Sequence, residues 1–123
     1  MDNFTNNKAI VNNFFKSKAN IIFFILQIAI NCATSLYIYQ NIKPSEQPIY
    51  LHYNIYFGVD LIGNWYQMYI LPLVGFIVIL INAIITLFIY KKSKILTNLI
   101  NSLTAILLLF VLLSAFLVVR QNI

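Results

Sequence analysis

Three long runs of apolar residues dominate the chain, and short polar segments separate them. The runs cover Asn20–Tyr39, Tyr69–Tyr90 and Ile95–Val119. Each supplies about the 20 residues that a helix needs to cross roughly 30 Å of hydrocarbon. Lipid satisfies no backbone hydrogen bonds and three short segments cannot close a barrel, so we expect each run to be a helix. The pattern predicts an all-α membrane protein with three transmembrane helices.

The polar segments divide the rest of the chain. The predicted order is a tail at 1–19, a helix at 20–39, a loop at 40–68, a helix at 69–90, a link at 91–94, a helix at 95–119 and a tail at 120–123. The link is too short to let its two helices separate, so they are expected to form an antiparallel helical hairpin. Pro72 falls within the first turn of the second helix, where its missing N–H costs little.

The first tail has two interpretations, which stay open. Phe4, Val11, Phe14 and Phe15 fall on one side of a helix, with asparagines and lysines elsewhere. This pattern fits a short amphipathic helix at the membrane surface. The asparagine content fits a disordered tail equally well.

Composition supports lipid as the surrounding solvent. Of the 123 residues, 61% are hydrophobic and 9% are charged, and a soluble domain of this size has too little interior to bury so much apolar surface. The single cysteine, Cys32, lies within the first run, so one chain holds no disulfide or zinc framework. That run is too long for an ordinary signal peptide and no small-residue cleavage site follows it, which favours a retained span.

Lysines set the predicted orientation. Most of them lie in the first tail and in the link: Lys8, Lys16, Lys18, Lys91, Lys92 and Lys94. The 40–68 loop has only Lys43, offset by Glu46. The positive-inside rule therefore places the N-terminus and the link in the cytoplasm and the loop outside, in the inner (plasma) membrane of a cell. The net charge of +5 is explained by these membrane anchors, and the chain has no basic module for nucleic acid.

Both ends of the second helix carry residues that anchor a helix at the membrane surface. They are Trp65, Tyr66 and Tyr69 before it and Lys91, Lys92 and Lys94 after it. Trp and Tyr favour the headgroup level. Cations that follow a helix C-terminus interact well with its dipole.

Polar residues inside the runs recur at helical spacing. They are Gln27, Asn31 and Ser35 in the first run, Asn82 and Thr86 in the second, and Asn98, Ser102 and Ala105 with Asn101 nearby in the third. Side-chain amides that face lipid lack partners, so we expect these faces to contact other helices. The alternative is an ion or substrate path. Such paths normally need an Asp, Glu, Lys, Arg or His in a span, and none of the three runs has one of these residues.

The 40–68 loop is expected to be ordered and partly extended. Pro44 and Pro48 keep its start out of helix. Over residues 49–61, apolar and polar positions alternate with the period of two that is typical of a strand. One apolar face would then lie on the bilayer surface or on a partner protein, and Gly58 and Gly63 are natural bend points.

Residues that carry chemistry gather in this loop. The candidate motif is Pro48, His52, Asn54, Gly58 and Asp60. In a straight strand His52 and Asp60 are about 26 Å apart, and they meet only if the chain reverses near Gly58. Such a pair can orient a water or bind a metal, but two ligands do not make a site. We favour a role in which His52, Asn54 and Asp60 form hydrogen bonds with the backbone of the loop itself. We predict no catalytic residue, metal site or cofactor.

The loop and the helix after it resemble a known family. The stretch from Pro48 to Asp60, PIYLHYNIYFGVD, followed by an apolar helix that opens with LPL at 71–73, is similar to a bacterial membrane domain of unknown function. That domain occurs in the immunity proteins against the sporulation-delaying toxin and in related small membrane proteins. The resemblance covers about residues 20–90. It implies an immunity-type function and transfers no catalytic residue.

Together these features predict a non-enzymatic accessory or immunity-type protein whose outer loop binds a partner. One alternative is a small structural subunit that docks on a larger membrane complex through its polar helix faces. Another is a membrane-embedded enzyme or transporter. The expected partners are the lipid bilayer and other membrane chains, including further copies of this one, and no nucleic acid. Abundant Ile, Asn, Lys, Phe and Tyr indicate an AT-rich genome and hence a bacterial or organellar source.

Overall fold

A computed structural model of the chain describes residues 2–123, without the side chains of residues 2–5, 53–54 and 59–60. Along this part the elements are α1 (Asp2–Lys16), α2 (Lys18–Asn41), β1 (Ile49–Asn54), β2 (Gly58–Gly63), the 3-10 helix η1 (Trp65–Tyr69), α3 (Ile70–Tyr90) and α4 (Lys94–Arg120). Within the described residues, three helical segments are long and apolar enough to cross a membrane: α2, η1 with α3, and α4. The predicted fold class, three apolar helices with an ordered and partly extended loop, is confirmed.

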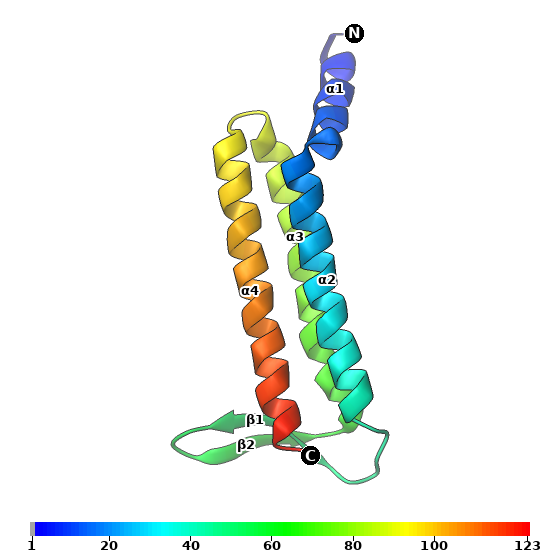
Figure 1. Cartoon of the computed structure of the whole chain (residues 1–123), viewed down its shortest axis with the longest axis vertical. Coiled ribbons are helices and arrows are strands. Elements are labelled where there is room, and N and C mark those ends of the chain that lie inside the picture. The colour runs from blue at the N-terminus through cyan, green and yellow to red at the C-terminus, as the bar shows by residue number, and fades with distance from the viewer. Residues whose placement is uncertain (1) are drawn as a thin grey trace.

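The three long helices lie side by side, with α3 antiparallel to α2 and α4 (Figure 1). One end of this bundle carries the link at 91–93, and we call it the lysine end. The other end carries the two strands at 49–63, and we call it the hairpin end. α1 extends beyond the lysine end along the long axis of the bundle (Figure 1).

The predicted tail is thus a helix in the structure. It is joined to α2 at Ser17, whose extended backbone (ψ 117°) interrupts the helical path. Phe14 is buried, and its ring packs edge-on against those of Phe24 and Tyr90. Val11 and Phe15 stay exposed, and the side chain of Phe4 lies outside the described residues.

Local signals explain where the spans begin and end. Ser93 caps α4, because its Oγ accepts a hydrogen bond from the Leu96 N–H at 3.2 Å. α2 covers 18–41 where 20–39 was predicted, and α4 covers 94–120 where 95–119 was predicted. The second span begins earlier than expected, because η1 already turns at Trp65. Hydropathy marks the apolar part of a helix, whereas the hydrogen-bonded turns continue into polar residues.

Two apolar clusters and one polar layer fill the space between the helices. The cluster near the hairpin end consists of Ile38, Ile42, Met68, Ala115 and Val119. The cluster nearer the middle consists of Ile30, Ile79 and Leu108. Toward the lysine end, the buried residues include Asn20, Gln27, Asn82, Thr86, Thr97 and Asn101. The outer faces of the helices carry exposed Ile, Leu and Phe instead, as expected of helices surrounded by lipid.

The loop between α2 and α3 folds into a β-hairpin. β1 and β2 pair antiparallel, with Ile49 opposite Gly63 and Asn54 opposite Gly58. The chain reverses at residues 55–57, and Gly58 takes the left-handed conformation (φ 74°) that glycine adopts without strain. The hairpin projects sideways from the hairpin end of the bundle (Figure 1).

The single apolar face expected over residues 49–61 does not continue past this turn. Ile49 and Leu51 are half-buried and pack against the cluster near the hairpin end. In β2, however, the neighbours Leu61 and Ile62 are 53% and 56% exposed. The chain reversal and an irregular register within β1 interrupt the period of two. Apolar side chains in the second half of the segment therefore remain at the surface.

Candidate functional site

The predicted loop motif is distributed along the hairpin. Pro48 directly precedes β1, and His52 lies within β1; both are exposed. Gly58 opens β2 opposite Asn54, where its positive φ allows the chain to reverse. The side chains of Asn54 and Asp60 lie outside the described residues.

The hairpin brings the backbones of His52 and Asp60 close together. Leu61, the residue after Asp60, is the β2 partner of His52, so the long separation of a straight strand does not apply. His52 also helps to line a groove of about 420 Å³ between the hairpin and α4, with Ile55, Ser114, Leu117, Val118 and Gln121. Among the described residues, no three His, Cys, Asp or Glu side chains gather as metal ligands do.

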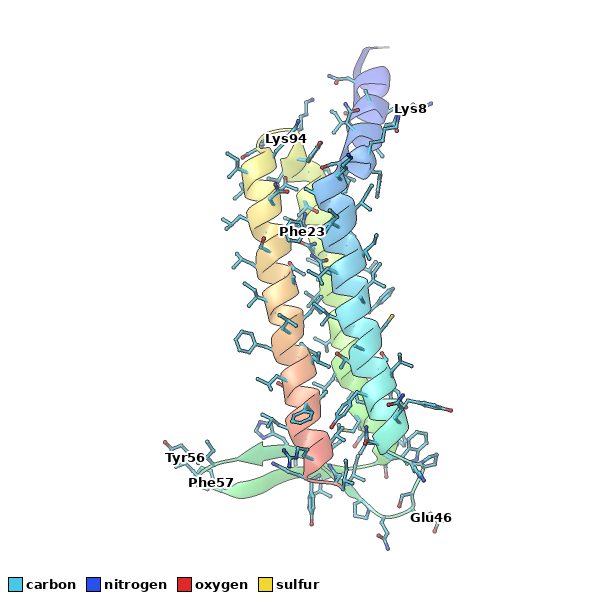
Figure 2. The ribbon with its side chains drawn as sticks, viewed as in Figure 1. Lys8, Phe23, Glu46, Tyr56, Phe57 and Lys94 are labelled. Atoms are coloured by element: carbon cyan, nitrogen blue, oxygen red, sulfur yellow. The ribbon has the colours of Figure 1, made fainter. Side chains whose placement is uncertain are left out.

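Three consecutive apolar residues form the tip of the hairpin. Ile55, Tyr56 and Phe57 are 87%, 88% and 83% exposed. Figure 2 shows Tyr56 and Phe57 at the point of the hairpin farthest from the helices. The tip thus presents an apolar surface that the bundle does not cover.

A residue near the C-terminus fixes the hairpin to the bundle. The Asn122 side chain bonds both backbone groups of Tyr50: Oδ1 accepts from its N–H at 2.8 Å and Nδ2 donates to its carbonyl at 2.8 Å. Nδ2 also donates to the Val118 carbonyl at 2.9 Å. Sequence reasoning missed Asn122, because the two partners are 72 positions apart and no local pattern links them.

The aromatic anchors line a second groove at the hairpin end. This groove has a volume of about 750 Å³, and its walls are Tyr39, Gln40, Ile42, Lys43, Pro44, Trp65, Tyr66 and Tyr69. The ring of Trp65 makes edge contacts with those of Tyr66 and Tyr69, with centroids 5.9 and 6.5 Å apart. Asn64 Nδ2 donates to the Tyr66 hydroxyl at 2.9 Å. Contacts among these neighbouring residues therefore fix the positions of the aromatic rings.

The lysine anchors lie at the opposite end. Lys91 and Lys92 are exposed in the turn after α3. Lys94, predicted to end the link, is instead the first residue of α4. Its Nζ lies 5.8 Å from the centroid of the Tyr90 ring, which is a cation–π contact.

A connected set of amides lies buried between the helices toward the lysine end. Asn82 of α3 is central: its Nδ2 donates to Gln27 Oε1 at 3.2 Å and to Asn101 Oδ1 at 2.8 Å. Its Oδ1 accepts from Thr104 Oγ1 at 3.1 Å. Gln27 Nε2 donates to the Asn101 carbonyl at 3.1 Å, and Asn101 Nδ2 donates to Asn20 Oδ1 at 3.4 Å. These bonds join α2, α3 and α4.

The remaining polar candidates bond within their own helices or face a neighbour closely. Ser35 Oγ donates to the Asn31 carbonyl at 3.1 Å, and Thr86 Oγ1 donates to the Asn82 carbonyl at 2.7 Å. Asn31 Oδ1 is buried without a hydrogen-bond partner among the described residues. It lies against Gly75, where any Cβ would collide with it. Gly75 thereby lets α2 and α3 approach closely.

No family model, curated protein or solved structure matches the chain. The resemblance to the immunity family of the sporulation-delaying toxin therefore stays a prediction. The three apolar helices are compatible with a small multi-pass membrane protein. Any finer function has to be argued from the geometry described above.

Proposed function

We propose that the chain is a small multi-pass protein of the cell inner membrane, with its N-terminus in the cytoplasm. It acts without catalysis, as an accessory or immunity-type protein that binds a partner protein through its hairpin. The observation that carries this proposal is the exposed apolar surface of an element that is hydrogen-bonded and fixed to the bundle. The lysines support the orientation, since only Lys43 lies in the segment that joins α2 to α3.

The edge of β2 is suited to a partner that binds in extended conformation. In the part of the chain that the structure describes, the sheet has two strands, so β2 pairs on one side only. β1 packs against α4 and is bonded at Tyr50 to Asn122. An unpaired edge presents a row of backbone donors and acceptors, and peptides commonly bind by adding a strand to it.

The side chains beside this edge favour pairing. Leu61 and Ile62 are more than half exposed, and so are the three residues of the tip at 55–57. Several exposed apolar side chains gathered on one element of a small protein indicate an interaction site. Between residues 49 and 63, Asp60 is the only acidic residue and no lysine or arginine is present. Edge strands that avoid pairing usually carry such blocking charges, lysine above all.

The alternative function, a structural subunit that docks through polar helix faces, has less support. Gln27 and Asn82, which such docking would use, bond to each other and to Asn101 inside the chain. The immunity interpretation and the broader accessory interpretation use the same hairpin surface. They differ in whether the partner is a toxin.

Site-specific photocrosslinking in native membranes tests the proposal. A photoreactive residue at Leu61 is expected to give one discrete adduct with another protein. The same residue at Phe88, which is 75% exposed on α3 toward the lysine end, is expected to give lipid adducts only. Equal protein adducts from both positions would contradict binding through the hairpin.

A pair of lysine variants tests whether the partner binds at the edge of β2: one places the charge on that edge, and the other is the matched control. Ile62→Lys is expected to remove most of the Leu61 adduct, because a lysine on an edge strand opposes pairing. Gln47→Lys adds the same charge to the exposed loop before β1 and should leave the adduct intact. Survival of the adduct in Ile62→Lys would show that the partner binds elsewhere.

A further inference from the structure

The aromatic groove at the hairpin end combines apolar walls with one cation. We propose that it binds an anionic phospholipid of the surrounding leaflet, with the headgroup phosphate beside Lys43 and the first part of an acyl chain along the aromatic wall. The inference requires only that the helices cross a membrane. It is independent of the proposed partner and holds for either orientation of the chain.

The groove lies where two spans reach the membrane surface. Tyr39 is in the last turns of α2 and is 73% exposed, and Trp65 opens η1 at the start of the second span. Trp and Tyr at the ends of membrane helices occupy the headgroup level. The groove therefore opens at the depth of lipid phosphates and the first acyl carbons.

The polar groups of the groove suit a phosphate. Among the described residues that line it, Lys43 is the one charged residue, so none of these side chains is a carboxylate that would oppose an anion. Gln40, another lining residue, adds an amide donor. The Tyr66 hydroxyl already accepts a hydrogen bond from Asn64, which leaves its own proton to donate to another acceptor. These donors complement the charge of a phosphodiester oxygen.

The apolar part of the groove favours a lipid over a free phosphate. Ile42 is 5% exposed and belongs to the cluster near the hairpin end, and Trp65 packs against this cluster. This apolar floor is therefore fixed by the bundle, and the partly buried ring of Trp65 forms the wall beside it. The volume of about 750 Å³ lies within the usual range of small-molecule sites. A polar rim above an apolar floor matches the two parts of a phospholipid.

Trp65 is the only tryptophan of the chain, so its fluorescence reports on this groove directly. The full chain is reconstituted into phosphatidylcholine vesicles that contain a small fraction of phosphatidylglycerol brominated on the upper acyl chain. A parallel sample contains brominated phosphatidylcholine at the same fraction. Quenching of Trp65 is expected to indicate about fivefold enrichment of phosphatidylglycerol, the gain expected for one lysine near an anionic lipid.

Two lysine variants separate binding in the groove from general attraction to a cationic protein. Lys43→Gln is expected to abolish the preference for phosphatidylglycerol, whereas Lys94→Gln, at the lysine end, should keep it. Should Lys43→Gln fail to fold by circular dichroism, Tyr66→Phe removes a donor but keeps the ring and should weaken the preference. Equal quenching by both lipids in the parent protein, or a preference retained in both groove variants, overturns the proposal. Relief of quenching by soluble glycerol phosphate assigns the site to free phosphate and overturns the lipid.

Discussion

At the scale of single residues, Asn82 selects how the three helices pack. Its amide bonds Gln27 on α2 and both Asn101 and Thr104 on α4. Lipid is as apolar as the helix surfaces, so no hydrophobic force brings membrane helices together, and close packing and polar contacts choose the arrangement. Rotating α3 about its axis would place this amide in hydrocarbon and leave several groups unpaired. The polar layer therefore specifies the rotation of α3.

Replacing Asn82 tests this argument. Asn82→Leu keeps a similar volume but orphans the groups on Gln27, Asn101 and Thr104, so we expect a loss of roughly 2 to 4 kcal/mol in unfolding free energy. Asn98→Leu makes the same change at an exposed position of α4, and should shift stability by less than about 0.5 kcal/mol. Denaturant unfolding of the protein in detergent micelles measures both. Similar losses in the two variants would contradict the role of the network.

The four-residue spacing of polar side chains identifies part of the buried network from the sequence. The four-residue spacing on the first two runs singled out Gln27 and Asn82, and in the structure these two side chains bond to each other between α2 and α3. On the third run it favoured Asn98, Ser102 and Ala105 with Asn101 nearby; the structure buries Ala105 and Asn101 and leaves Asn98 exposed. α4 carries a second polar stripe at helical spacing, Thr97, Asn101 and Thr104, and this is the stripe that the structure buries. Two neighbouring polar faces of α4 therefore compete for burial, and packing against α2 and α3 decides between them.

At the scale of elements, the hairpin depends on the bundle for its stability. Two paired strands are marginal alone in water. Here Ile49 and Leu51 pack against the apolar cluster, and Asn122 bonds both backbone groups of Tyr50. Alternation along 49–61 predicted the extended conformation, and Gly58 was the visible sign of the turn. The tip sequence Ile-Tyr-Phe at 55–57 contains none of the usual turn residues. The exact position of the turn therefore could not be predicted from the sequence.

Removing the Asn122 side chain tests this dependence. Asn122→Ala deletes both bonds to Tyr50, and we expect amide hydrogens in residues 49–63 to exchange roughly tenfold faster or more. Peptides from α3 should exchange at the parent rate. Gln121→Ala truncates the preceding exposed side chain and serves as the control. The prediction is wrong if the two variants exchange alike, and hydrogen–deuterium exchange with mass spectrometry distinguishes these outcomes.

At the scale of the whole molecule, the two ends of the bundle differ in chemistry. The lysine end carries the link lysines and the start of α2, whereas the hairpin end carries the aromatic groove and the apolar hairpin (Figure 1). Hydropathy predicted the three helices and their order, because a run of about 20 apolar residues in lipid can satisfy its backbone hydrogen bonds by forming a helix. It could not predict that the hairpin projects sideways, since this depends on contacts between β1 and the end of α4.

The difference between the ends makes the orientation of the molecule testable. Cys32 is first replaced by alanine, and one cysteine is then placed at exposed Gln47 or at exposed Lys92. The positive-inside rule predicts that the lysine end lies in the cytoplasm. A maleimide that does not cross membranes is therefore expected to label Gln47→Cys in intact cells and Lys92→Cys only after lysis. The reverse labelling pattern would show that the orientation is inverted, with the hairpin in the cytoplasm. Labelling at both positions in intact cells would mean that the lysines do not fix one orientation, and the hairpin would then face both compartments.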